Sequence, residues 1–134
     1  MTLSSQIRSG LGLATFFLSV IFAVPVLASD PIQITSNPGE DFAPSISPDG
    51  SFMVYVSDTS GNLDLWMKYL GVGIQPPDRR LTFHSTEDKS PAISPDGKKV
   101  AFVSHRGDPR GDIYILDLQN TNDPVAVVKG KDED

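Results

Sequence analysis

Short apolar runs alternate with polar segments along most of the chain, a pattern typical of β-strands joined by turns. Two near-continuous apolar runs, Phe52–Val56 and Val100–Val103, are rich in β-branched and aromatic residues. Such composition predicts strands that are covered on both faces. Each run follows a Ser-Pro-Asp-Gly tetrapeptide, in which proline presets the first central φ of a turn and glycine accepts a positive φ. Both runs are therefore predicted to be the second strand of a β-hairpin.

The two hairpins belong to an internal repeat. Pro44 and Pro91 occupy equivalent positions, 47 residues apart, and the same offset aligns Val54 with Ala101. After one extra loop residue the alignment resumes, so that Asp-Leu-Trp-Met at 64–67 matches Asp-Ile-Tyr-Ile at 112–115. A repeat of this length indicates that one supersecondary unit occurs twice.

Each unit contains two further predicted strands. The third strands are expected at Leu63–Leu70 and Asp112–Leu118, and weaker fourth strands at Arg80–Phe83 and Val125–Val128. No segment after residue 28 has helical apolar periodicity. Four short antiparallel strands in about 47 residues are typical of a β-propeller blade. The predicted fold class is all-β, with two four-stranded antiparallel β-propeller blades, a partial propeller, after an N-terminal signal peptide.

The N-terminal segment has the layout of a secretory leader. Gly10–Ala28 is apolar and uncharged, and Arg8 precedes it. Val26 and Ala28 are small residues at positions −3 and −1 relative to a possible signal-peptidase site, so cleavage is expected after Ala28. The product is expected to be periplasmic or secreted. An uncleaved anchor is the alternative, because the apolar stretch approaches the ~20 residues that span a bilayer. The predicted organisation is a signal peptide at 1–28 and two blades within 29–134, at about 36–83 and 84–128, with the start of a third repeat at 129–134.

Composition narrows the possible functions. The 134 residues include 17 acidic and 11 basic side chains and no cysteine, with a formal net charge of −6. No basic surplus is available to neutralise phosphates, so a nucleic-acid partner is not expected. The lack of cysteine excludes disulfides and thiol chemistry. The chain also lacks the motifs of hydrolase elbows, zinc proteases and phosphate loops, so we expect neither catalysis nor a metal or cofactor.

Five residues are candidates for binding: Asp41, Trp66, Asp88, Arg106 and Tyr114. The two aspartates recur ahead of the first strand of each unit, where a carboxylate can bind a cation or a partner's amine, or hold the local loop through hydrogen bonds. The two aromatic residues share one position of the third strand, as a ligand platform or as packing. Arg106 belongs to a basic group that can meet an acidic partner or remain solvated.

The ordered motifs resemble the repeat of TolB-type β-propellers over roughly residues 32–134. They are Asp-x-x-Pro, Ser-Pro-Asp-Gly, Val-Tyr-Val-Ser or Ala-Phe-Val-Ser, Gly-Asn-x-Asp-Leu-Trp or Gly-Asp-Ile-Tyr, and Arg-Leu-Thr. This resemblance implies a periplasmic protein-interaction module of the Tol-Pal envelope system, with the peptidoglycan-associated lipoprotein or Tol proteins as partners. Similar repeats accompany prolyl-oligopeptidase-like hydrolases and polysaccharide lyases. The alternatives are an orphaned propeller portion of such an enzyme and a nonfunctional truncated gene product.

The number of blades raises a further question. Propellers close with about four to eight blades, and this sequence contains two. Because Ile34-Thr35 aligns with Leu81-Thr82, the segment Ile32–Thr35 is predicted to be the outer strand of an additional blade. Two expectations follow: the chain is a truncated part of a longer propeller, or copies of it form a homo-oligomer, such as three chains in a six-bladed ring.

Overall fold

The computed structural model describes residues 29–128. The strands are β1 (Asp41–Ile46), β2 (Phe52–Ser57), β3 (Asp64–Tyr69), β4 (Arg79–Arg80), β5 (Asp88–Ile93), β6 (Lys99–Ser104), β7 (Asp112–Asp117) and β8 (Val125–Val128). Within that range, no helix has the length and apolar character needed to cross a membrane. The predicted signal peptide at 1–28 and the predicted third repeat at 129–134 lie outside the described residues.

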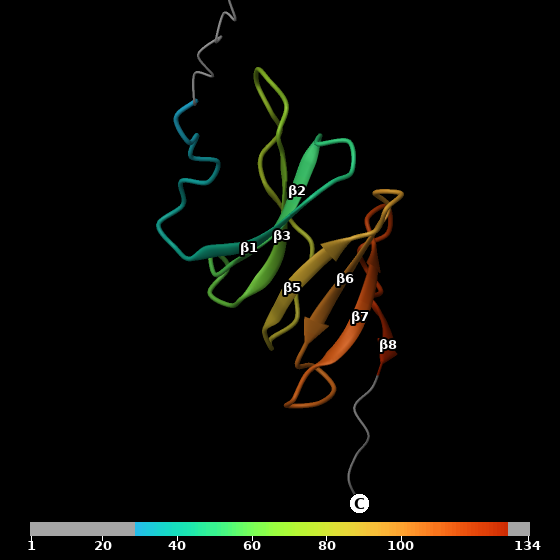
Figure 1. Ribbon diagram of the computed structural model, residues 1–134. Coiled ribbons are helices and arrows are strands. Elements are labelled where there is room, and N and C mark those ends of the chain that lie inside the picture. The colour runs from blue at the N-terminus through green and yellow to red at the C-terminus, as the bar shows by residue number, and fades with distance from the viewer. Residues whose placement is uncertain (1–28, 129–134) are drawn as a thin grey trace, which may run out of the picture. The chain divides into compact units, whose positions relative to one another are not determined.

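The strands form two antiparallel sheets of four. Their orders are β1-β2-β3-β4 and β5-β6-β7-β8, so each strand pairs with its neighbour in sequence. In Figure 1 the first sheet runs from teal to green and the second from gold to red. We refer to them as blade 1 and blade 2. The predicted all-β class with two four-stranded blades is confirmed.

Two strand predictions need correction. β4 covers two residues rather than four. Its backbone pairing with β3 does not extend to Thr82, because the Leu65 N–H donates at 3.0 Å to the Thr82 side-chain hydroxyl instead of to a backbone carbonyl. The predicted strand Ile32–Thr35 is wrong, since these residues pair with no strand in the described part of the chain. A strand requires a neighbouring edge for its backbone groups. The Thr35 carbonyl instead accepts a local hydrogen bond from the Gln33 side chain at 2.7 Å.

The first strand of each blade, β1 or β5, contains the same β-bulge, which the sequence patterns did not predict. Ala43 and Ser90 have positive φ angles of 50° and 54°, and each precedes a proline. The strand register shifts at these points in β1 and in β5. Proline has no N–H to donate, so a bulge is a position where it interrupts no ladder hydrogen bond. The bulge therefore explains how the Asp-x-x-Pro motif fits within a strand.

The core lies between the two blades. Val54, Val56 and Leu65 of blade 1 are fully buried against a blade 2 face that includes Phe102 and Leu116. Met53 and Tyr55, on the opposite face of β2, are also buried, so the predicted burial on both faces is confirmed for β2.

The same prediction is wrong for β6. Phe102 is buried, whereas Ala101 and Val103 on the opposite face are only half-buried. The difference arises because no other sheet of the described chain covers that face of blade 2.

The Ser-Pro-Asp-Gly turns share one hydrogen-bond pattern. In blade 1 the Asp49 carboxylate accepts from the Ser47 hydroxyl at 2.7 Å and from the Ser51 N–H at 3.0 Å. The turn closes at Gly50, whose φ is 72°. In blade 2, Asp96 accepts equivalent hydrogen bonds from Ser94 and Lys98, at 2.6 and 3.0 Å. The aspartates of this motif therefore have a structural role.

The substitution Asp49→Asn is expected to reduce the pH dependence of stability. Hydrogen bonds from Ser47 and then Ser51 lower the pKa of Asp49 to about 2, whereas an unfolded aspartate titrates near 3.9. Folding thus favours the charged carboxylate, so its contribution is complete above about pH 4 and is lost as the pH falls through about 2. Urea unfolding should show the advantage of the wild type over Asp49→Asn shrinking as the pH is lowered.

Asp96→Asn provides the matched comparison. The Ser94 hydroxyl, and then the Lys98 N–H, lower the pKa of Asp96 in the same way. We expect the same direction of change for both variants. A stability difference that stays constant with pH would contradict this role of the turn carboxylates.

Candidate functional site

Both blades carry the same row of polar residues at one end. In blade 1 the strand register places Asp41 opposite Ser57, and Ser57 opposite Asp64. Blade 2 repeats the row with Asp88, Ser104 and Asp112. All of these side chains except that of Asp41 are buried. Because a buried carboxylate is costly without partners, the residues around each row determine what this end of the blades can do.

In blade 1, Asp64 is fully buried and well partnered. Its carboxylate accepts hydrogen bonds from Arg80 at 2.7 Å and from the Ser60 hydroxyl at 2.6 Å. The Arg80 guanidinium also lies 4.8 Å from the centre of the Phe83 ring, as a cation–π contact. Asp64 thereby holds β3, β4 and the following linker together.

In blade 2 the fully buried acid Asp88, which is equivalent to Asp41, pairs with an arginine from the loop after β6. Arg106 donates to Asp88 at 2.9 Å and to the Ser104 hydroxyl at 2.8 Å. Its guanidinium lies 4.9 Å from the centre of the Tyr114 ring and 5.7 Å from that of Phe102. The structure therefore brings together three predicted binding residues, Asp88, Arg106 and Tyr114.

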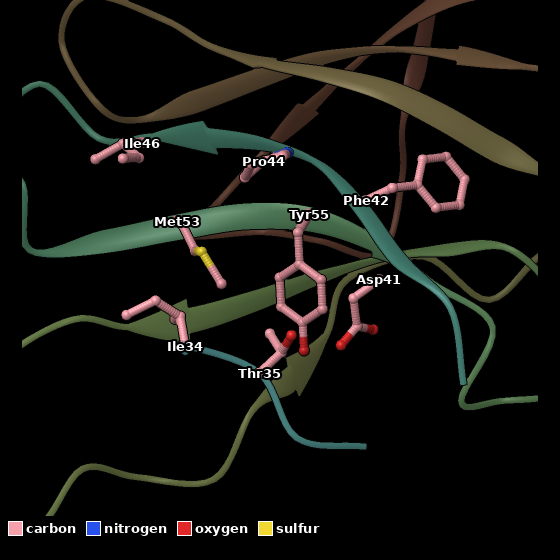
Figure 2. A pocket seen from close by; sticks show the side chains of 8 residues that line it. All are labelled: Ile34, Thr35, Asp41, Phe42, Pro44, Ile46, Met53 and Tyr55. Carbon is pink, nitrogen blue, oxygen red and sulfur yellow. The ribbon is translucent and has the colours of Figure 1, made fainter. Parts of the chain in front are cut away.

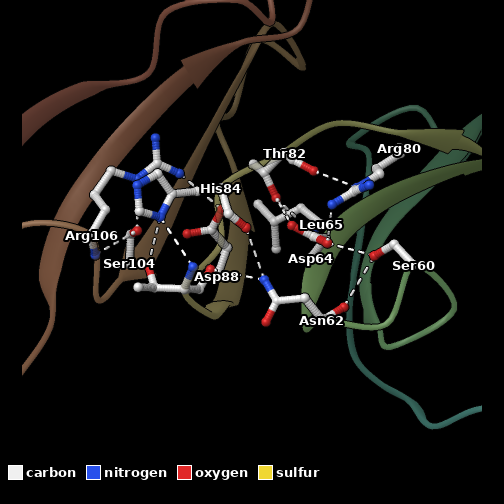
Figure 3. A network of polar contacts seen from close by, with 11 residues as sticks. Ser60, Asn62, Asp64, Leu65, Arg80, Thr82, His84, Asp88, Ser104 and Arg106 are labelled. Carbon is white, nitrogen blue, oxygen red and sulfur yellow. Dashed lines mark hydrogen bonds and ion pairs between the residues drawn. The ribbon is translucent and has the colours of Figure 1, made fainter. Parts of the chain in front are cut away.

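The linker between the blades joins these two clusters, as Figure 3 shows. The Asn62 side chain donates to the backbone carbonyls of His84 and Thr86, at 2.9 and 3.0 Å. The Thr86 N–H donates to Nδ1 of His84 at 3.1 Å, so neutral His84 carries its proton on Nε2. The Asp88 N–H donates to the Leu63 carbonyl at 2.8 Å. These contacts lock the linker against the end of blade 1.

Beside this network lies a cavity of about 240 Å³, which we call the inter-blade cleft. Residues of the linker and of two blade 2 loops line it, including Phe83, His84, Arg106, Thr121 and Asn122. Phe83 is largely exposed. A space of this volume is smaller than the pockets that enclose drug-sized ligands and suits one or two side chains of another protein. The cleft offers an apolar ring beside several hydrogen-bonding groups.

Asp41 has a different environment from its equivalent, Asp88. Its carboxylate accepts a hydrogen bond from the Asn37 side chain at 2.8 Å. Burial raises the pKa of Asp41. Hydrogen bonds from Asn37, Ser57 and Thr35 together lower the pKa by more than burial raises it, so the net shift is downward. An amide thus takes the place of the guanidinium that serves Asp88.

Asp41 also lines a second cavity, of about 260 Å³, on the face of blade 1 that points away from blade 2 (Figure 2). We call it the outer groove. The Tyr55 hydroxyl there donates to Asp78 at 2.9 Å, and Asp78 in turn forms an ion pair with Lys68 at 2.8 Å. Burial first, and then Asp78, raise the pKa of Tyr55. Asp41 therefore belongs to a largely apolar groove rather than to the network around Arg106.

The two predicted aromatic residues also differ in environment. Tyr114 is buried in the core between the blades. Trp66 pairs with Tyr55 across strands β2 and β3, is half-buried, and has a buried Nε1 with no acceptor among the described residues. Among residues 29–128, no group of three or more possible ligands is placed to hold a metal ion.

Comparison with solved structures identifies the fold as TolB-like, with blades of the β-propeller type. TolB from Acinetobacter baumannii matches with a TM-score of 0.55 and 24% identity, covering 67% of this chain and 22% of that chain. A putative TolB from Agrobacterium tumefaciens matches with a TM-score of 0.57 and 25% identity, covering 69% of this chain and 34% of that chain. This chain thus spans about a fifth to a third of the length of these structures. No protein-family model matches the sequence, and no curated protein matches it.

Several residues of the site were missed by sequence reasoning. Asp64 had a signal, because an aspartate opens the third strand in both repeats. Asn62 had none, since its repeat equivalent is of another type and its hydrogen-bond partners lie in the linker 22 and 24 residues further along the chain. Repetition reveals the acids, whereas the donors that neutralise them differ between the blades.

Replacing Arg106 with alanine is expected to destabilise the protein by about 3 kcal/mol, because Asp88 would keep a buried charge without its cationic partner. Lys89→Ala is the control. Its ion pair with Glu87 is at the surface, with 46% of the Glu87 side chain exposed, so we expect a loss of less than about 1 kcal/mol. Urea unfolding monitored by circular dichroism measures both.

Adding Asp88→Asn to the Arg106→Ala variant should restore part of the lost stability, because no buried charge then remains. Equal losses for Arg106→Ala and Lys89→Ala would contradict the proposed role of the pair.

Proposed function

We propose that this protein is an exported, TolB-like β-propeller module that binds another protein in the cell envelope. The observation that carries the proposal is the TolB-like arrangement of two blades, with the linker between them and two loops of blade 2 converging on the inter-blade cleft. Binding sites are commonly formed by loops that a rigid scaffold holds in place. The peptidoglycan-associated lipoprotein is the first partner to test, and the Tol proteins are the second.

The chemistry of the cleft favours binding over catalysis. The buried carboxylates of Asp64 and Asp88 each pair with an arginine, which leaves only Oδ1 of Asp88 without a donor among these contacts, and Nδ1 of His84 accepts a backbone hydrogen bond. These groups are fixed in place by structural contacts. Phe83, by contrast, presents an exposed ring at the mouth of the cleft. An aromatic side chain beside hydrogen-bonding groups is typical of the residues that contribute most to protein interfaces.

The substitution Phe83→Ser should weaken binding to the peptidoglycan-associated lipoprotein by about tenfold, because an exposed aromatic anchor is lost. Isothermal titration of the exported protein against the purified lipoprotein measures this effect. Val72→Ser is the control, since Val72 is fully exposed in the loop between β3 and β4, outside the cleft. If neither the lipoprotein nor the Tol proteins bind, the proposed envelope partners are wrong. If Val72→Ser weakens binding as much as Phe83→Ser, the cleft is not the site.

Export with cleavage after Ala28 is part of this proposal. Expression of the full chain in a bacterial host should give a periplasmic product whose N-terminal sequence begins Ser29-Asp30. Ala28→Arg should block processing, because the −1 position requires a small residue. Ala23→Leu keeps the apolar segment and should be processed normally. N-terminal sequencing and mass spectrometry of cell fractions provide the measurement. An unprocessed 14.5 kDa wild type in the membrane fraction would indicate the uncleaved anchor instead.

A further inference from the structure

One nitrogen of Arg106 is available to a molecule in the inter-blade cleft. Its Nε donates to Ser104 at 2.8 Å, and its Nη2 donates to Asp88 at 2.9 Å. Among the described residues Nη1 has no acceptor, and it is not one of the buried polar atoms that lack a partner, so it reaches solvent. In Figure 3 the guanidinium nitrogen without a dashed line points away from the other residues drawn. Because Arg106 lines the cleft, Nη1 can donate its N–H groups to a bound molecule.

His84 offers a second donor to the same cleft. Its Nδ1 accepts a hydrogen bond from the Thr86 N–H at 3.1 Å, so the neutral ring carries its proton on Nε2. Within the described part of the chain Nε2 has no acceptor, and it is not a buried atom either. The backbone thus selects the tautomer in which His84 presents an N–H, and not a lone pair, to the cleft. Two donors on one cavity favour a ligand that carries acceptor oxygens.

The guanidinium of Arg106 is held in one orientation before any ligand binds. Besides its two hydrogen bonds, it lies 4.9 Å from the centre of the Tyr114 ring and 5.7 Å from that of Phe102. The Asp88 side chain is 0% exposed, whereas 17% of the Arg106 side chain is exposed, so a molecule in the cleft meets the arginine and not the acid. A donor that is already fixed loses little conformational freedom on binding.

The remaining lining of the cleft is compatible with an anion beside an apolar group. Of the described residues that line it, none is acidic, and Arg106 is the basic one. Asp123 lies near the cleft in sequence but is exposed and is not part of the lining. The Phe83 ring is 68% exposed, and the Arg80 guanidinium lies 4.8 Å from its centre. An apolar side chain next to an acidic one would therefore find a partner surface here.

We propose that the inter-blade cleft binds an Asp or Glu side chain from an acidic segment of the partner protein. Nη1 of Arg106 and Nε2 of His84 donate to the carboxylate, and Phe83 contacts an apolar side chain next to the acid. A carboxylate is favoured over a neutral carbonyl because its hydrogen bonds with a guanidinium are charge-assisted and about twice as strong. The inference rests on the proposed function and describes the chemistry of its partner.

Titration of the isotope-labelled protein, purified after expression of the full chain, tests the proposal by NMR. The probe is the peptide acetyl-Gly-Leu-Glu-Leu-Gly-amide, whose blocked ends leave the glutamate as its one carboxylate. A second peptide with glutamine in place of the glutamate is the matched control. We expect the glutamate peptide to shift the signals of the Arg106 Nε–H and the His84 ring. Its affinity should exceed that of the glutamine peptide by about tenfold, because the charge-assisted hydrogen bonds are lost in the latter.

Arg106→Lys should weaken binding of the glutamate peptide by about tenfold. The single lysine nitrogen can keep the ion pair with Asp88, but no second nitrogen then remains for the cleft. Circular dichroism should show that the variant is folded. Arg79→Lys is the matched control, because Arg79 lines a different cavity, and it should bind the peptide like the wild type.

His84→Asn should weaken the same binding by about three- to tenfold. The asparagine oxygen can take the place of Nδ1 as acceptor for the Thr86 N–H, but asparagine has no atom at the position of Nε2. His105→Asn is the matched control, since His105 does not line the cleft, and it should leave the affinity unchanged.

Three results would overturn the proposal: no binding of the glutamate peptide at millimolar concentration, equal binding of the two peptides, or shifted signals that all lie outside the cleft. If the lipoprotein binds and depends on Phe83 while the two peptides bind alike, the proposed function stands and the carboxylate site is wrong. If the glutamate peptide binds in the cleft while neither the lipoprotein nor the Tol proteins bind, the carboxylate site stands and the named partners are wrong.

Discussion

The face-to-face burial of one sheet on the other is the interaction on which the rest of the structure depends. A four-stranded sheet has two faces, and each blade here is apolar on both. Packing Leu65 and Val56 against Phe102 and Leu116 removes one face of each blade from water. It also brings the ends of the two blades together, and this is what creates the polar network and the inter-blade cleft. The remaining apolar faces are a direct consequence of the same pattern.

Buried carboxylates impose the second constraint. Each blade carries acidic residues at the same end of the sheet, and each acid needs a donor close by. Asp88 obtains an arginine from the loop after β6, whereas its equivalent, Asp41, obtains an asparagine from the segment before β1. Two blades with the same strand pattern thus differ in charge and exposure at the surface that their loops form. Such differences allow a repeat protein to present a specific binding surface on a regular scaffold.

The TolB-like fold places this chain among proteins built from repeated blades, and the chain spans about a fifth to a third of the TolB structures it resembles. Stability in such architectures comes from contacts between neighbouring blades as much as from within each blade. Val103 is half-buried and Ile113 is exposed on the face of blade 2 that no other sheet of the described chain covers.

The sequence by itself determined the repeat, the all-β class, the hairpin turns at Ser-Pro-Asp-Gly and the position of most strands. These features depend on local residue patterns and on the internal repeat, and both can be read from the amino-acid sequence. Only the tertiary structure decided that Asp88, Arg106 and Tyr114 form one cluster, that Trp66 lies apart from them, and that β6 is covered on one face. Those outcomes depend on which segments, distant in sequence, lie beside each other, and a single sequence records the residues but not their neighbours.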